Sequence, residues 1–69
     1  MLSIENLRKG YSYQITNHGE QIDFEVIEFI EDDYMVKNID TLEVFNLKEL
    51  VQYGLGKDYE LIDIEEHEE

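Results

Sequence analysis

Cysteine is absent from the sequence, so neither a disulfide bond nor a thiolate metal site can stabilise the chain. The 69 residues leave room for one domain with a small core, and a domain of this size buries only about 60% of its unfolded surface. Stability therefore has to come from dense packing, from oligomerisation or from a partner.

Long apolar runs are absent as well. No segment approaches the roughly 20 apolar residues of a membrane-spanning helix, and no charged and then apolar signal peptide begins the sequence. We therefore expect a cytoplasmic protein with no membrane partner. The hydrophobic content of 42% is normal for a globular domain, which argues against general disorder.

Basic residues are scarce. Five Lys and Arg stand against 18 Asp and Glu, which gives a formal net charge of -13. DNA, RNA and anionic membranes are themselves polyanions, so this charge disfavours all three as partners. Two interpretations stay open: a solvated acidic surface that keeps the protein soluble, or a docking face for a basic partner.

The residue patterns of common catalytic and cofactor sites are missing. No glycine-rich phosphate loop joins a strand pattern to a helix pattern, and Glu31-Asp32-Asp33 lacks the spaced oxygen ligands and the glycine of a calcium loop. A nucleophile–base pair would need His18, in an expected exposed turn, or His67, in the tail. We therefore expect neither an enzyme nor a cofactor or metal site.

One long strand in the middle of the chain organises the predicted fold. Ile22, Phe24 and Val26 alternate with acidic residues, which predicts a strand with one face on the core and one in water. The phase then slips by one residue, because the next apolar pair is Ile27 and Phe29. Such a slip turns later side chains to the wrong face unless a bulge absorbs it. We therefore predict one strand that bends near Val26 and Ile27.

A three-stranded meander follows from this strand. The adjacent acids at 31–33 predict a turn, because Asp is common in turns and rare within strands. The chain then returns in a strand over residues 34–39, turns again at 40–41 and forms a third strand over 42–45. Three strands with one covered face are the smallest antiparallel unit expected to be stable.

The residues before the meander predict a short helical turn and a first strand. Ser3 can cap a turn over residues 2–7, and Gly10 is placed to end it in a left-handed conformation. Alternating side chains over residues 11–16 predict the strand, and residues 17–20 its hairpin turn, because Asn and Gly accept positive φ.

The residues after the meander predict a helix, a last strand and a tail. Asn46 is the expected helix cap with Glu49 as its reciprocal partner, and Gly54 closes the helix after at most eight residues. The last strand is expected over residues 59–64. We expect a disordered acidic tail over 65–69, because its like charges repel and it has nothing to bury.

This order of elements resembles the Src-homology-3-like small barrels, in which five strands curl into a partly open barrel and a one-turn helix precedes the last strand. The resemblance rests on Leu7-x-x-Gly10-Tyr11 before the first strand, on the bent segment 21–30 and on the helix before residues 58–64. The chain also looks like small acidic single-domain proteins of bacteria.

Pattern and resemblance together predict a mainly β protein: one small five-stranded antiparallel barrel over residues 1–64, with a short helix before the last strand and a helical turn at the N-terminus. The resemblance also implies a binding module. Tudor-like and chromo-like members use aromatic cages, and peptide-binding members use aromatic-lined grooves. Members that bind RNA carry basic loops, and this chain departs from them.

We therefore predict a non-enzymatic interaction domain that docks a basic or polar protein segment through tyrosine and carboxylate groups. The candidate residues are Tyr11, Tyr13, Tyr34, Tyr53, Tyr59, Glu31, Asp32 and Asp33. The tyrosines have a structural alternative, in which their half-buried rings cap the core. Two other functions stay open: an acidic mimic that occupies the nucleic-acid site of another protein, and a structural unit that forms homo-oligomers through an exposed edge strand.

Overall fold

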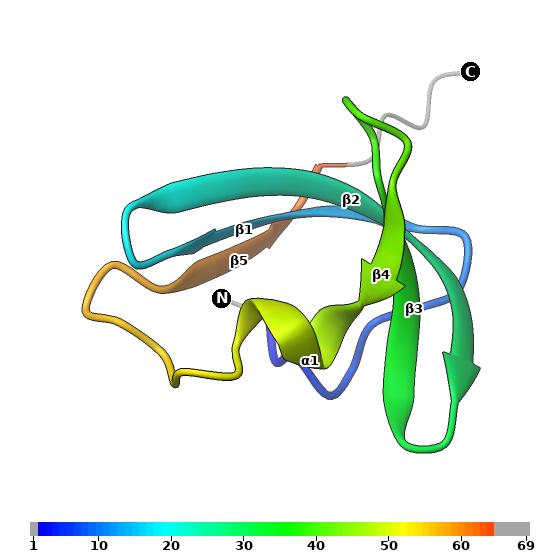
Figure 1. Cartoon of the computed structure of the whole chain (residues 1–69), viewed down its shortest axis with the longest axis horizontal. Helices are drawn as coiled ribbons and strands as arrows, with labels where there is room; N and C mark the ends of the chain where they lie inside the picture. The colour runs from blue at the N-terminus through cyan, green and yellow to red at the C-terminus, as the bar shows by residue number, and fades with distance from the viewer. Residues whose placement is uncertain (1, 65–69) are drawn as a thin grey trace.

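A computed structural model describes residues 2–64 and contains one sheet of five antiparallel strands, with a short helix before the last strand (Figure 1). The order of strands across the sheet is β4-β3-β2-β1-β5. The elements are β1 Ser12–Asn17, β2 Glu20–Ile30, β3 Asp33–Asn38, β4 Val44–Asn46, α1 Leu47–Leu50 and β5 Glu60–Asp63. The predicted mainly β class, the meander and the late helix are therefore confirmed. The tail expected over residues 65–69 lies outside the described residues.

Strand β2 belongs to both halves of the sheet and arches across it in Figure 1. Its first half pairs with β1, and its second half pairs with β3. The register to β3 shifts between Val26 and Glu28, which is a β-bulge with Ile27 as the extra residue. The bend predicted near Val26 and Ile27 is confirmed, because the bulge absorbs the slip in the hydrophobic pattern.

Both long hairpins turn through two residues with positive φ, the type I′ geometry that matches the twist of the strands. His18 and Gly19 join β1 to β2 with φ values of 51° and 81°, and Glu31 and Asp32 join β2 to β3 with 55° and 66°. His18 is exposed, as predicted. The acidic turn is one residue shorter than predicted, because Asp33 already pairs as the first residue of β3.

The predictions for β4 and α1 need correction. The strand expected from residue 42 begins only at Val44, because Leu42 has a φ of 67° that no regular strand accommodates. Helix α1 has four residues, and the Asn46 side chain makes no capping hydrogen bond. After α1 the chain continues in turns, in which the N–H of Gly54 donates to the carbonyl of Val51 at 3.0 Å. An apolar pattern does not distinguish such turns from further helix.

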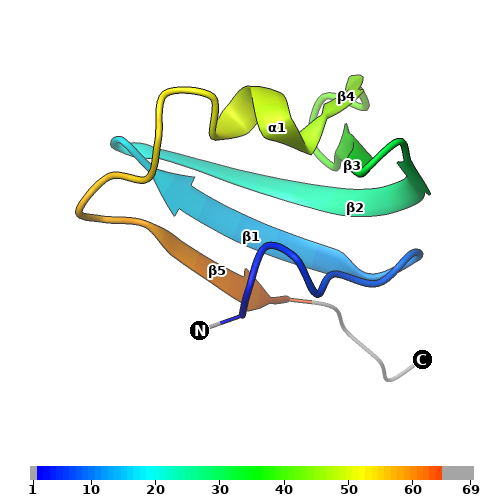
Figure 2. The ribbon, with the colours of Figure 1, turned by 90° about the horizontal axis from the view of Figure 1, so that it is seen from below.

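The sheet does not close into the expected barrel. Within residues 2–64, β4 and β5 are the two edges of the ladder, and no pairing joins them. Both edge strands are short, since β4 has three residues and β5 has four, so each offers few backbone groups for a closing pair. Helix α1 packs beside β3 and β4 (Figure 2). Within residues 2–64, no helix is long and apolar enough to cross a membrane.

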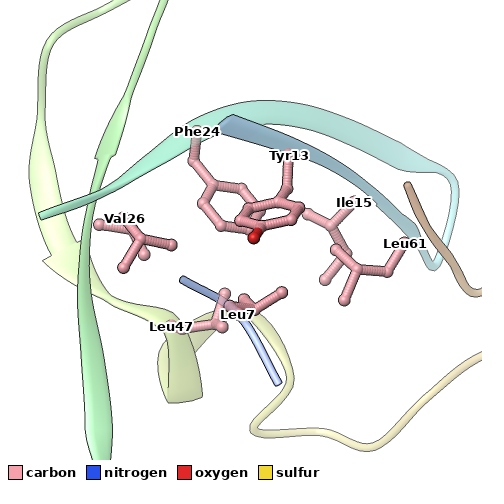
Figure 3. Packing of buried hydrophobic residues seen from close by; sticks show 8 residues of the cluster. Leu7, Tyr13, Ile15, Phe24, Val26, Leu47 and Leu61 are labelled. Atoms are coloured by element: carbon pink, nitrogen blue, oxygen red, sulfur yellow. The ribbon is translucent and has the colours of Figure 1, made fainter. Parts of the chain in front are cut away.

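The core gathers one or two side chains from nearly every element (Figure 3). Its buried hydrophobic residues are Leu7, Tyr13, Ile15, Phe24, Val26, Val36, Leu47 and Leu61. In β1 and in β2 up to the bulge, the core residues follow the alternation of the strand, because every second side chain points toward the core. Each fully buried large side chain contributes about 1.5–3 kcal/mol to folding.

The N-terminal turn is fixed to this core by two tyrosine hydroxyls. The backbone N–H of Arg8 donates to the Tyr13 hydroxyl at 3.0 Å, and that of Leu7 donates to the Tyr34 hydroxyl at 3.2 Å. Leu7 itself is buried in the core. This attachment holds the N-terminal turn against the sheet, where it forms one wall of a groove.

Candidate functional site

A groove of about 350 Å³ opens between the N-terminal turn, the tip of the β2–β3 hairpin and α1. We call it the acidic groove. Its lining residues are Ile4, Leu47 and Val51, the aromatic pair Phe29 and Tyr34, and the charged residues Glu5, Asp32, Asp33 and Lys48. Apolar and aromatic side chains with a few charged groups are the usual composition of a ligand site.

The aromatic wall of the acidic groove exists because of the bulge in β2. Tyr34 pairs with Phe29, and Val36 pairs with Val26, so these four residues share one face of the hairpin. Without the extra residue, Glu28 would take the place of Phe29 on that face. The rings of Phe29 and Tyr34 have centroids 4.9 Å apart at an interplanar angle of 57°. Phe29 is 55% exposed, so its ring is open to a ligand.

Two adjacent carboxylates of the groove have different tasks. Asp33 accepts hydrogen bonds from the backbone N–H of Tyr34 at 2.7 Å and of Lys48 at 3.3 Å, and so ties the hairpin tip to α1. The carboxylates of Asp32 and Glu5 have no hydrogen bond or ion pair with any residue of 2–64. These two charges are therefore available to a ligand, whereas that of Asp33 is engaged.

The local charge favours a cation. At neutral pH three carboxylates line the groove against one ammonium group, that of Lys48. Glu31, next to Asp32 in the turn, adds a further exposed carboxylate at the hairpin tip. None of these groove and hairpin-tip acids forms an ion pair with residues 2–64, where the ion pairs are Lys9 with Glu28 and Lys37 with Glu25. The arrangement can hold a positively charged group beside an apolar and aromatic surface.

The structure brings Tyr34, Asp32 and Asp33 of the predicted site together in this groove, with Glu31 at its edge. The other four tyrosines lie elsewhere, so the five do not form one cluster. Tyr13 is only 3% exposed and lies in the core.

The remaining tyrosines have separate environments. Tyr11 stacks on Tyr13 with ring centroids 6.5 Å apart, and the guanidinium carbon of Arg8 lies 5.7 Å from the Tyr11 centroid. Tyr53 is 85% exposed in the loop after α1. Tyr59 packs partly buried against the core, and burial raises the pKa of its hydroxyl above the usual 10.0.

Sequence reasoning missed the apolar half of the groove, above all Phe29, Ile4 and Val51. The phase slip that predicted the bend also contained the signal for Phe29, because an extra residue in β2 moves this ring to the inner face. Ile4 and Val51 carried no such local signal, since they reach the groove only through tertiary packing.

A second polar cluster joins the β1–β2 turn to the loop before β5. The Asp58 carboxylate accepts hydrogen bonds from the backbone N–H of Gly19 at 2.7 Å and of His18 at 2.9 Å. The Gly19 bond, together with that of His18 and the nearby His18 ring, holds the pKa of Asp58 below the usual 3.8, although desolvation opposes this. The Asn17 side-chain amide also joins these two segments: it donates a hydrogen bond to the Gly54 carbonyl and accepts one from the Gly56 N–H. These bonds are all internal, so this cluster is structural.

The described residues contain no metal-binding cluster. Within residues 2–64, no group of three or more His, Cys, Asp or Glu side chains is placed to hold a metal ion. The comparisons with known proteins were negative: no family model, no curated protein and no solved structure matches this chain.

Proposed function

We propose that this chain is a non-enzymatic interaction domain that docks a basic segment of a partner protein in the acidic groove. The observation that carries the proposal is the pairing of an exposed aromatic wall, Phe29 and Tyr34, with the unpaired carboxylates of Asp32 and Glu5. A lysine or arginine matches both parts, because its alkyl stem packs on apolar surface while its charge meets a carboxylate.

The net charge of -13 supports the same class of partner. An excess of negative charge raises the association rate of basic partners and repels acidic ones. The charged contacts lie at an open groove and are screened by salt, so the apolar contacts to Phe29, Ile4 and Val51 have to supply most of the affinity.

We further propose that the domain is a relative of the Src-homology-3-like small barrels. The strand order β4-β3-β2-β1-β5, the bent β2 shared by both halves of the sheet, and the short helix before β5 support this assignment. Such folds serve as binding modules, which agrees with a docking role, although fold alone does not fix function.

The test is an NMR titration of the 15N-labelled full chain with a peptide of alternating Lys and Leu. A peptide with Glu in place of Lys is the ligand control. The proposal predicts shifts of backbone amides around the acidic groove with the Lys peptide and none with the Glu peptide.

Matched variants make this test specific. Phe29→Ala should weaken binding about tenfold or more, and Asp32→Asn should weaken it about two- to fivefold. Glu20→Gln removes the same charge from an exposed position outside the groove and should change the affinity less than twofold. Equal losses for Asp32→Asn and Glu20→Gln would mean non-specific charge attraction and would overturn the proposal.

A further inference from the structure

The β3–β4 loop has an unusual backbone conformation at Leu42. Its φ of 67° lies in the left-handed region, which is rare for residues other than Gly, Asn and Asp. The Leu42 side chain is nevertheless 65% exposed, so burial against residues 2–64 does little to offset the strain. A strained backbone that presents an exposed apolar side chain is a reason to look for a function at that residue.

The loop that carries Leu42 is held rigidly by hydrogen bonds around Asn38. The Asn38 side-chain oxygen accepts from the N–H of Asp40 at 2.8 Å and of Thr41 at 3.1 Å, and the Asn38 carbonyl accepts from the N–H of Leu42 at 2.7 Å. The N–H of Asn38 donates to the carbonyl of Glu43 at 2.8 Å, which closes the loop. Leu42 is thus presented on a preorganised loop, and little conformational entropy is lost when such a loop binds.

Exposed apolar side chains continue from Leu42 into the edge strand. Val44 is 54% exposed, and Ile39 at the start of the loop is 40% exposed. The charged residues next to them in the sequence, Asp40 and Glu43, are both acidic and have no ion pair among residues 2–64. Lys37, which pairs with Val44 across the strands, is already engaged by Glu25 at 3.9 Å. Figure 1 shows this loop projecting from the sheet beyond β3 and β4.

A shallow groove next to Val44 has the same character. It measures about 520 Å³, and its charged lining residues are Glu43 and Glu49, with no base. The loop and this groove therefore form one surface of apolar side chains and carboxylates. We call it the Leu42 surface.

We propose that the Leu42 surface is a second docking site, at which Leu42 inserts into an apolar pocket rimmed by Lys or Arg on a partner protein. Charge complementarity selects this occupant, because Asp40, Glu43 and Glu49 would face the rim of the pocket. A second copy of this chain does not fit, since its own apolar groove is rimmed by carboxylates and would repel these acids. The site is independent of the acidic groove, as the two share no lining residue.

The test uses substitutions that keep the backbone conformation of the loop. Leu42→Asn and Leu42→Gly both accept positive φ and both remove the apolar side chain. Neither should lower the melting temperature, and Leu42→Gly should raise it by a few degrees, because the relief of left-handed strain outweighs the entropy that Gly adds to the unfolded chain.

The probe is a synthetic amphipathic helical peptide of Leu and Lys, whose apolar face is edged by ammonium groups. With the 15N-labelled full chain, the proposal predicts amide shifts over residues 39–45 and an affinity that falls about fivefold or more in Leu42→Asn and Leu42→Gly. Asp32→Asn and Phe29→Ala are the matched controls and should leave the shifts over 39–45 in place.

Two results would overturn this assignment. The first is a failure to detect binding of the peptide through Leu42: either its affinity measured at residues 39–45 does not change in Leu42→Asn and Leu42→Gly, or the amide shifts are confined to the acidic groove. The second is self-association: a dimer of the unmodified chain in analytical ultracentrifugation that becomes a monomer in Leu42→Asn would make a second copy the occupant. Unchanged binding at the acidic groove in Phe29→Ala would disprove only the acidic-groove proposal.

Discussion

The carboxylate of Asp33 accepts a hydrogen bond from the backbone N–H of Lys48 at 3.3 Å, across 15 residues of sequence. Lys48 is the second residue of α1, so Asp33 supplies from β3 the acceptor that a helix usually takes from its own N-cap. This bond replaces the cap expected from Asn46. It also fixes the hairpin tip beside the helix and so sets the width of the acidic groove.

We predict that Asp33→Ala lowers the free energy of unfolding by about 1 kcal/mol, because two backbone donors lose their acceptor. Asp32→Asn, one residue earlier, should change it by less than about 0.5 kcal/mol, since Asp32 has no partner and Asn tolerates the left-handed backbone there. Urea unfolding of the two variants measures the difference. Equal losses would show that Asp33 does not hold α1.

The pH dependence of stability should report on Asp58. Its pKa is lowered in the folded state, so its contribution is present above the unfolded pKa near 3.8 and is lost as the pH falls through the lower folded value. We predict that the native chain is more stable than Asp58→Asn at pH 7, and that the two converge below pH 3.8. Comparing the pair removes the effect of the other carboxylates, which titrate in both. A gap that persists at the acid end would mean that the Asp58 contribution is not electrostatic.

Tyr59 should act at the opposite end of the pH scale. Burial raises the pKa of its hydroxyl, so the unfolded chain ionises first, and stability is lost as the pH rises from about 10.0 through the higher folded value. Tyr59→Phe should abolish this part of the alkaline loss, whereas Tyr53→Phe, at an 85% exposed position, should leave it unchanged. Thermal unfolding between pH 9 and 11, values around the usual tyrosine pKa of about 10, compares the three chains.

Much of the fold could be predicted because its signals are local. The alternation along β1 and β2, the turn residues at His18-Gly19 and Glu31-Asp32, and the phase slip at Val26 each lie within a few residues of sequence. Closure of the sheet could not be judged this way, since it depends on whether two short edge strands, far apart in the chain, meet in space.

The candidate site was predictable only in its polar half. Asp32, Asp33 and Tyr34 are adjacent in the sequence, so the hairpin turn alone brings them together. Ile4 and Val51 join them through the packing of two remote segments. The left-handed backbone of Leu42 could not be foreseen either, because leucine has no preference for it and the surrounding hydrogen bonds impose it.

Added salt should stabilise the protein. The 18 acids repel one another, and the two ion pairs within residues 2–64 are exposed and worth less than about 1 kcal/mol each. We predict a melting temperature that rises between about 50 and about 500 mM NaCl at pH 7. At pH 4.2, the pI of the sequence, the net repulsion vanishes, and so should the effect of salt. An unchanged melting temperature at pH 7 would mean that the acids are dispersed widely enough not to interact.

Gly56 is the position where an added methyl group has no room. Its N–H donates to the Asn17 side chain at 2.7 Å, and a Cβ there would lie 2.9 Å from His18 Nδ1 and 3.0 Å from Asp58 Oδ1. Neither neighbour can move freely, because His18 Nε2 hydrogen-bonds the Gly54 carbonyl at 2.9 Å and Asp58 accepts from the N–H of His18.

We therefore predict that Gly56→Ala lowers the free energy of unfolding by about 1–2 kcal/mol, as overpacking does elsewhere. Where space is free, Gly→Ala usually stabilises by about 0.4–1 kcal/mol, so the sign of the change is itself informative. His18→Ala should recover part of the loss when added to Gly56→Ala, because it removes the nearest obstructing atom. Urea unfolding of the two single variants and the double variant gives the coupling energy. Strictly additive losses would mean that the Gly56 methyl does not meet the His18 ring.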